Sequence, residues 1–294
     1  MANTSPPVDT TRPGATTTSM TNDSPPAKSR RGRGGRQKLA SVGWAAAPPA
    51  TFVVIILLWA AAVEIFTIPS YLLPSPMAVL SRMFDERSNL LAQAVPTLEA
   101  LGIGLLLCLV ISIPAGLLIA LSKVAKQTIY PIVMLMQLVP KIAIAPLLLV
   151  WLGFSIQTKV GLVVLIAFFP LLMSSIAGFV SLDDRLLYLT RSMGASKMQT
   201  FWRLRLPAAL PIIFSGIKTC ATIAITGALV AEFLASNEGL GYALLRAGSQ
   251  LDTTYIFAIL VVLTLIGIVI NYLIEAVEWW LTPWQRHQKQ QGKK

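Results

Sequence analysis

The stretch from Leu101 to Ala120 reads LGIGLLLCLVISIPAGLLIA and contains no charged side chain. A helix needs about 20 apolar residues to cross the hydrocarbon core of a bilayer. Two further runs, Phe52 to Val63 and Ala258 to Ile270, are equally free of charge. None of the three alternates apolar and polar residues as the strands of a membrane barrel do. The sequence therefore predicts an all-α membrane protein.

The composition of the whole chain agrees with lipid as its main solvent. Of its 294 residues 55% are hydrophobic and only 13% are charged, and the mean hydropathy is +0.69. A water-soluble domain of this length rarely buries that much apolar surface. Charges and prolines divide the apolar sequence into six predicted transmembrane helices, at residues 50–66, 97–121, 129–151, 159–179, 208–234 and 255–280.

The distribution of Lys and Arg predicts how these helices are oriented. With both termini in the cytoplasm, the inner segments contain eighteen of the 24 basic residues, whereas the outer loops contain only Arg82, Arg87, Lys159 and Arg246. Positive charge accumulates on the cytoplasmic side of membrane proteins. We therefore expect a multi-pass protein of the cytoplasmic (inner) membrane, with both termini inside the cell.

The net charge of +11 does not indicate nucleic acid as a partner, because the charge is concentrated at the two ends of the chain. Residues 1–48 are rich in Thr, Ser, Pro, Gly and Arg, which predicts a disordered basic cytoplasmic tail. Residues 284–294 form a second basic cytoplasmic tail. We interpret both as topology signals that also attract anionic lipid.

The sequence lacks the residues that several kinds of functional site require. No segment matches the phosphate-binding pattern Gly-x-x-x-x-Gly-Lys-[Ser/Thr], so we expect no ATP site on this chain. The single histidine, His287, lies in the polar tail, which argues against a metal site and a catalytic triad in the membrane. Cys108 and Cys220 both lie in apolar runs, so a disulfide is not expected.

The most informative motif lies between the fourth and fifth predicted spans, in residues 181–207, which we call the coupling loop. From residue 188 it reads YLTRSMGASKMQTFWRLRLP. It resembles the signature of ABC importer permeases, which is Glu-Ala-Ala, three residues, Gly, nine residues, Ile, one residue and Leu-Pro. Gly194, Leu204, Leu206 and Pro207 match this signature in identity or class, whereas Tyr188-Leu-Thr stands where the family has Glu-Ala-Ala.

The residues of the motif also predict a local structure. Gly194 accepts a left-handed turn between two short helices, and Pro207 suits the first turn of the next span. In the family this segment docks on an ATPase subunit, although an ordinary cytoplasmic loop remains the alternative. The residues that the resemblance assigns to coupling are Tyr188, Arg191, Gly194, Ala195, Phe201, Leu204, Leu206 and Pro207.

The resemblance extends from about residue 68 to 284. It includes Leu-Pro-Ser-Pro at 73–76, PKIAIAP at 140–146, WLGF at 151–154 and EGLGY at 238–242. These segments are similar to the branch that imports nitrate, sulfonates, taurine, thiamine precursors or riboflavin-like compounds. The resemblance implies a type I ABC importer permease fold over residues 49–283, with a core region at about 93–281.

The same resemblance implies the partners of the chain. They are a cytoplasmic ATPase dimer that uses ATP and Mg²⁺, a second permease copy in a homodimer, and an extracytoplasmic substrate-binding protein. This chain itself would bind no cofactor and would not be an enzyme. The substrate stays open between sulfonate, taurine or nitrate and a thiamine-precursor pyrimidine or riboflavin.

Polar groups and prolines inside the predicted spans are candidates for the translocation path, because such groups are costly in lipid. These are Gln137, Pro140, Lys141, Pro146, Thr222, Thr226 and Glu232. Packing kinks or contact with water at the membrane surface are the alternatives. In the outer segment, residues 236–242, which we call the gate segment, Gly239, Gly241 and Tyr242 are candidates for an outer gate, with a plain connecting loop as the alternative.

Two other classes of protein remain as alternatives. A polytopic membrane enzyme needs converging catalytic groups, and the predicted spans contain no paired aspartates and no Ser with a His partner. A secondary transporter usually has more spans or an internal repeat. The sequence therefore favours the permease of an importer that translocates a small solute delivered by a binding protein.

Overall fold

The computed structural model describes residues 34–284, so most of both predicted tails lies outside the described residues. The chain divides after Val54 into two units. Of the first unit, the structure describes residues 34–54, which are the beginning of α1, Gly34–Ile65. Residues 34–48, the end of the predicted tail, therefore belong to this helix.

The described residues form helices and no strands, which confirms the predicted all-α class. After α1 come α2 (Pro76–Asp85), α3 (Arg87–Leu121), α4 (Lys123–Leu138), a 3₁₀ turn (Lys141–Ile144), α5 (Ala145–Leu152), α6 (Ile156–Val180), α7 (Asp184–Ser192), α8 (Lys197–Thr200), a π turn (Phe201–Arg205), α9 (Leu206–Ala235), α10 (Leu240–Ser249) and α11 (Thr253–Leu281).

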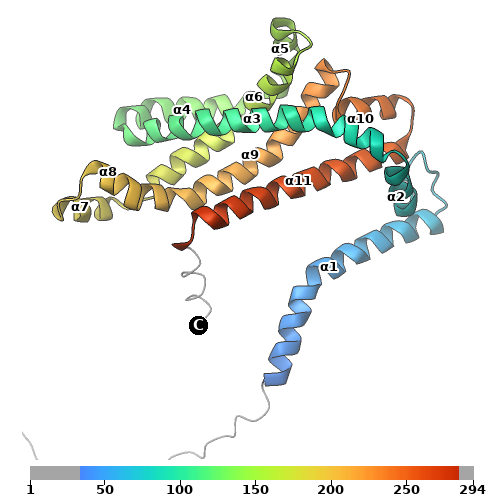
Figure 1. The fold of residues 1–294 in the computed structure, drawn as a ribbon, viewed down its shortest axis with the longest axis horizontal. Coiled ribbons are helices and arrows are strands. Elements are labelled where there is room, and N and C mark those ends of the chain that lie inside the picture. The colour runs from blue at the N-terminus through green and yellow to red at the C-terminus, as the bar shows by residue number, and fades with distance from the viewer. Residues whose placement is uncertain (1–33, 285–294) are drawn as a thin grey trace, which may run out of the picture. The chain divides into compact units, whose positions relative to one another are not determined.

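The core of the second unit is formed by α3, α6 and α9 (Figure 1). Small residues recur every four positions along α3, at Ala100, Gly104, Cys108, Ser112 and Gly116, and all five are buried. A Cβ atom added at Gly104 would overlap the side chain of Val163, and one at Gly116 would lie 2.6 Å from Ser175 Cβ. Such small-residue seams let helix backbones approach closely in a membrane, where apolar burial gives no preference for protein over lipid.

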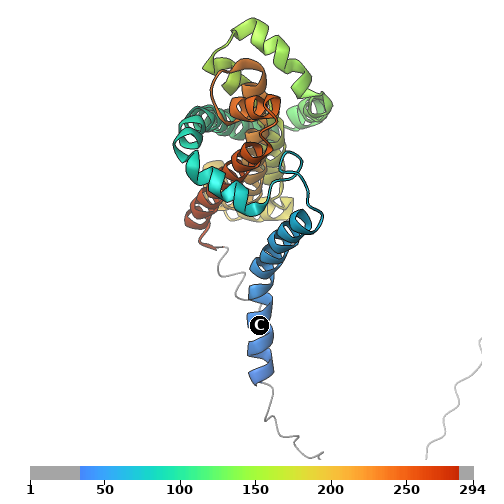
Figure 2. The same ribbon diagram turned by 90° about the vertical axis from the view of Figure 1, so that its right-hand side faces the viewer.

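The two ends of this helical bundle carry different segments. Figure 1 places α7 and α8 at one end and α10 at the other, with α9 running between them. The view along the bundle in Figure 2 has the α10 end facing the reader. The coupling loop and the gate segment thus lie at opposite ends of α9, as expected for segments on opposite sides of a membrane.

The predicted span at residues 129–151 is not one continuous helix. It is broken between α4 and the 3₁₀ turn, and the helices on either side meet at a bend of 79°. Val139 has an extended backbone, with ψ of 130°, because a residue before proline is disfavoured in the helical region. Pro140 precedes the 3₁₀ turn and Pro146 lies in the first turn of α5, so neither removes a hydrogen bond from the interior of a helix.

Four helices in the described part of the chain are long and apolar enough to cross a membrane, and the bent pair would make a fifth. They correspond to the predicted spans from residue 97 onward. The predicted span 50–66 is present as the apolar part of α1, Ala50–Ile65, which is shorter than the others. α3 begins at Arg87, ten residues before the predicted start, and continues through Pro96.

Candidate functional site

The coupling loop begins with α7, which ends in the left-handed turn predicted at Gly194. Gly194 has a φ of +78°. Its N–H donates to the carbonyl of Arg191 at 3.0 Å, and the N–H of Ala195 donates to the carbonyl of Thr190 at 3.0 Å. This pair of hydrogen bonds is the Schellman motif, which satisfies the last carbonyls of a helix and favours glycine at the left-handed position.

The next helix starts immediately and leads without interruption into the membrane. Ser196 and Gln199 form a reciprocal capping box at the start of α8. A π turn from Phe201 to Arg205 follows, and its last hydrogen bond runs from the N–H of Leu206 to the carbonyl of Phe201. Pro207 then lies in the first turn of α9, as predicted. The second half of the coupling loop, from Lys197, is therefore one end of a continuous helix of 39 residues, Lys197–Ala235.

Aromatic packing fixes the loop to the bundle. The ring of Phe201 stacks on that of Phe179, at the end of α6, with centroids 6.4 Å apart. Both rings pack in a cluster with Ala209 and Ile213 of α9 and with Leu117 of α3. The loop is consequently in packing contact with three helices of the core, α3, α6 and α9.

The outward surface of the loop is apolar as well as basic. Tyr188, Met193, Met198 and Trp202 are 60–78% exposed. A cavity of about 510 Å³ lies beside them and has three basic side chains in its lining, those of Arg191, Lys197 and Arg205. Exposed aromatic, methionine and arginine side chains are typical of protein interfaces.

At the other end of α9, a buried carboxylate holds the gate segment. Glu232 is completely buried. Its Oε1 accepts a hydrogen bond of 2.7 Å from Thr97 Oγ1, and its Oε2 accepts one of 2.6 Å from the N–H of Gly241. The Thr97 hydroxyl in turn accepts from the N–H of Leu240 at 2.9 Å. Glu232 thus caps the N-terminus of α10, where backbone N–H groups and the helix dipole favour a carboxylate.

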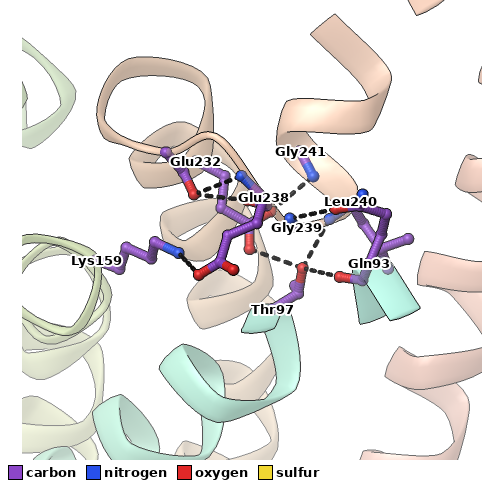
Figure 3. A network of polar contacts seen from close by, with 9 residues as sticks. Gln93, Thr97, Lys159, Glu232, Glu238, Gly239, Leu240 and Gly241 are labelled. Carbon is purple, nitrogen blue, oxygen red and sulfur yellow. Dashed lines mark hydrogen bonds and ion pairs between the residues drawn. The ribbon is translucent and has the colours of Figure 1, made fainter. Parts of the chain in front are cut away.

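Three helices contribute to this network, as Figure 3 shows. From α3, Gln93 Oε1 accepts a hydrogen bond of 2.6 Å from the N–H of Gly239. From α6, Lys159 Nζ lies 3.2 Å from Glu238 Oε1. Gly239 has a φ of +103°, and a Cβ atom at this position would overlap the Glu232 carboxylate. The gate segment is therefore fastened to α3, α6 and α9 at once.

The remaining path candidates lie on other surfaces. Gln137 is exposed at the end of α4, and its carbonyl accepts a hydrogen bond of 2.8 Å from Lys141 Nζ. The ammonium of Lys141 also lies 5.2 Å from the ring centre of Phe169. Thr222 and Thr226 are exposed on one face of α9, whereas Glu232 points into the protein. The structure thus brings the coupling residues together and separates the path candidates into an exposed and a buried group.

Residues 34–284 contain no group of three His, Cys, Asp or Glu side chains that could bind a metal ion.

The comparisons with known proteins agree with this geometry. The family described as binding-protein-dependent transport system inner membrane component matches residues 112–287. The chain belongs to this family. The resemblance to the permease subunits of ABC importers is thereby confirmed, and the matched region includes both the coupling loop and the gate segment of the permease.

Curated relatives of the permease differ in their named substrates. The formylaminopyrimidine transport permease protein ThiX of Halalkalibacterium halodurans is 35% identical over 82% of this chain and 96% of the relative. The riboflavin transport system permease protein RibX of Chloroflexus aurantiacus is 32% identical over 81% and 89%. The taurine transport system permease protein TauC of Escherichia coli is 28% identical over 85% and 90%.

The fold of the permease is similar to that of a solved importer. An inward-facing structure of the MetNI methionine ABC transporter superposes with a TM-score of 0.57 and 20% sequence identity, covering 64% of this chain and 94% of that chain. The predicted type I ABC importer permease fold is thus confirmed.

Sequence reasoning missed most of the polar network around Glu232. Gln93 and Thr97 were not singled out, Lys159 was considered only as a charge of an outer loop, and Glu238 only as part of the EGLGY segment at the gate. The sequence did contain one signal for this network. Thr97 and Glu232 lie beside or within apolar runs, where a polar side chain needs a polar partner. Their separation of 135 residues hides the pairing in a single sequence.

Proposed function

We propose that this permease imports a small nitrogen heterocycle, with energy from a cytoplasmic ATPase dimer that docks on the coupling loop. The observation that supports ATPase docking is the projecting surface of Tyr188, Met193, Met198 and Trp202 on a loop joined rigidly to α9. ATP and Mg²⁺ act on the ATPase subunits. A second copy of this chain completes the pathway, and both termini lie in the cytoplasm.

Transport then follows from movement of the loop. Closure of the ATPase dimer displaces α7 and α8, and the Phe201–Phe179 stack and the continuous α8–α9 helix carry this displacement into the core. An extracytoplasmic binding protein delivers the solute at the opposite end, near the gate segment. Gln137, Pro140, Lys141 and Pro146 at the bend, and Thr222 and Thr226 on α9, are the proposed contacts along the path.

The experiment for ATPase docking is the substitution Gly194→Val, with Gly194→Asn as its matched control. Space is not the obstacle, because a Cβ atom at Gly194 would have no atom within 4 Å. The positive φ is costly for valine, by about 1–2 kcal/mol, but asparagine tolerates it better. We expect the Val variant to lose co-purification of the ATPase and the Asn variant to retain it. Equal co-purification of both variants would contradict this role of the loop.

The cargo proposal is supported by the relatives, because those named for a pyrimidine and for riboflavin are 35% and 32% identical, whereas the taurine and aliphatic sulfonate permeases are both 28% identical. The test is uptake by cells that express the complete importer, with labelled formylaminopyrimidine, riboflavin and taurine supplied in turn. Accumulation of a heterocycle is the expected result. Accumulation of taurine alone would replace the heterocycle by a sulfonate as the cargo.

A further inference from the structure

A single helix joins the two ends of the permease. It runs through α8, the π turn and α9 from Lys197 to Ala235, which at about 1.5 Å per residue is ~58 Å long. The coupling loop is at its beginning, and Glu232 lies within one turn of its end. A movement of this helix as a rigid body is therefore expressed at Glu232.

The attachment of Glu232 to α10 is direct and specific. Each carboxylate oxygen is used once, by Thr97 and by the N–H of Gly241. The carboxylate is also enclosed, because a Cβ atom at Gly241 would lie 2.9 Å from Glu232 Oε2 and one at Gly239 would overlap the carboxylate. Glycine at both positions is what allows the chain to approach the acid so closely.

The apolar contacts of α10 lead to three helices. Leu240 and Ala243 pack in one cluster with Leu90 and Ala94 of α3, with Ile259 and Leu263 of α11, and with Ile225 and Leu229 of α9. Hydrophobic packing is not directional, whereas hydrogen bonds to a buried carboxylate require a fixed geometry. The polar link thus adds a directional contact to the apolar packing and the short connection at 236–239 that also join α10 to α9.

We propose that Glu232 is the positioning residue that fastens the gate helix α10 to the end of α9, so that movement of the coupling loop reaches the gate segment through this buried carboxylate. The inference rests on the proposed function only in that the ATPase supplies the movement. Thr97 assists by holding Glu232 and the N–H of Leu240 with one hydroxyl group.

The test is hydrogen–deuterium exchange of residues 239–249 in the complete complex of permease and ATPase in nanodiscs, with and without a non-hydrolysable ATP analogue. The variant is Glu232→Gln, which keeps the size of the side chain but has only one acceptor oxygen, so it cannot accept from both Thr97 and the N–H of Gly241. Glu275→Gln is the control, since Glu275 is an exposed acid on α11. Basal ATP hydrolysis is measured in the same samples.

In the wild type and in Glu275→Gln, we expect the analogue to change exchange in α10. In Glu232→Gln, exchange of the first turn should rise on the order of tenfold, as for loss of a helix cap, and should no longer respond to the analogue, while ATP hydrolysis stays within about twofold. A response in Glu232→Gln equal to that of the wild type overturns the inference, and so does a wild type without any response. Failure of the wild-type chains to form a complex would instead contradict the proposed ATPase docking.

Thr97 provides a second pair of variants in case Glu232→Gln does not assemble. Thr97→Val removes the hydroxyl at nearly constant shape, and Thr97→Ser restores it. We expect the Val variant to lose the response of α10 and the Ser variant to keep it. If both behave alike, the polar link does not position α10 and the inference is wrong.

Discussion

At the scale of single residues, the ion pair between Lys159 and Glu238 is strongly asymmetric. The side chain of Lys159 is 6% exposed, whereas that of Glu238 is 65% exposed. A buried charge without a partner is costly, but an exposed carboxylate remains solvated when its partner is removed. The two partners should therefore respond differently to substitution.

We predict that Glu238→Gln destabilises the permease more than Lys159→Met does. The first substitution leaves the Lys159 ammonium buried without its carboxylate, at a cost of about 1–3 kcal/mol. The second replaces the cation by an uncharged side chain of similar length and leaves the exposed Glu238 carboxylate in water. Thermal unfolding in detergent compares the two variants, and a larger loss in Lys159→Met would show that the pair itself, rather than the buried cation, determines stability.

Single residues also show how far sequence reasoning reaches. The left-handed turn at Gly194 was predicted correctly, because it depends on local backbone geometry. Pro207 lies in the first turn of α9 as expected, although α9 continues the helix that begins at Lys197. Glu232 was recognised as a costly acid in an apolar run, but its capping of α10 depends on Thr97, which lies 135 residues away in the sequence. Pairings of this kind are set by the packing of α3 against α9 and cannot be derived from one sequence.

At the scale of elements, two glycines of α3 have similar sequence neighbours but different surroundings, because only one of them lies on the seam of small residues. Gly104 faces Val163 of α6, whereas a Cβ atom at Gly102, half a turn away, would have no atom within 4 Å. The two positions lie on the same helix and at a similar depth in the membrane. They therefore separate the effect of helix packing from the intrinsic effect of glycine in a helix.

We predict opposite outcomes for alanine at these positions. Gly104→Ala should destabilise the bundle by about 1–3 kcal/mol, because the added methyl group forces α3 and α6 apart. Gly102→Ala should be neutral or stabilising by about 0.5–1 kcal/mol, because alanine favours the helix. Chemical unfolding in mixed micelles measures both, and destabilisation of equal size would refute the seam as the reason for Gly104.

The elements show a second limit of the sequence. Apolar length predicted the spans from residue 159 onward to within three residues, since long uncharged runs leave few alternatives. Pro140 and Pro146 indicated a hinge or a kink in this span, but not the complete break with its 79° bend, because a proline inside an apolar run is compatible with either. Packing of Ala145 with Leu162 and Ala231 accompanies the break that the structure adopts.

At the scale of the whole molecule, sidedness can be tested with cysteine labels. Cys108 and Cys220 are completely buried, so the unmodified permease should not react with a membrane-impermeant maleimide. Met193 and Asn237 are exposed at opposite ends of the bundle. We predict that Asn237→Cys reacts in intact cells, whereas Met193→Cys reacts only after the membrane is opened. The reverse pattern would invert the proposed topology.

Glycine at the crossings of α3, α6 and α9 brings the three helices very close together. One added methyl group at Gly104, Gly116 or Gly227 would touch a neighbouring helix. Helix backbones this close together leave no path for water or ions between them. A single chain is then a sealed wall rather than a tube, and alone in a vesicle it should leave proton and ion gradients intact. The path of a solute has to run along the exposed faces of these helices, where it can open without separating the helices of the core.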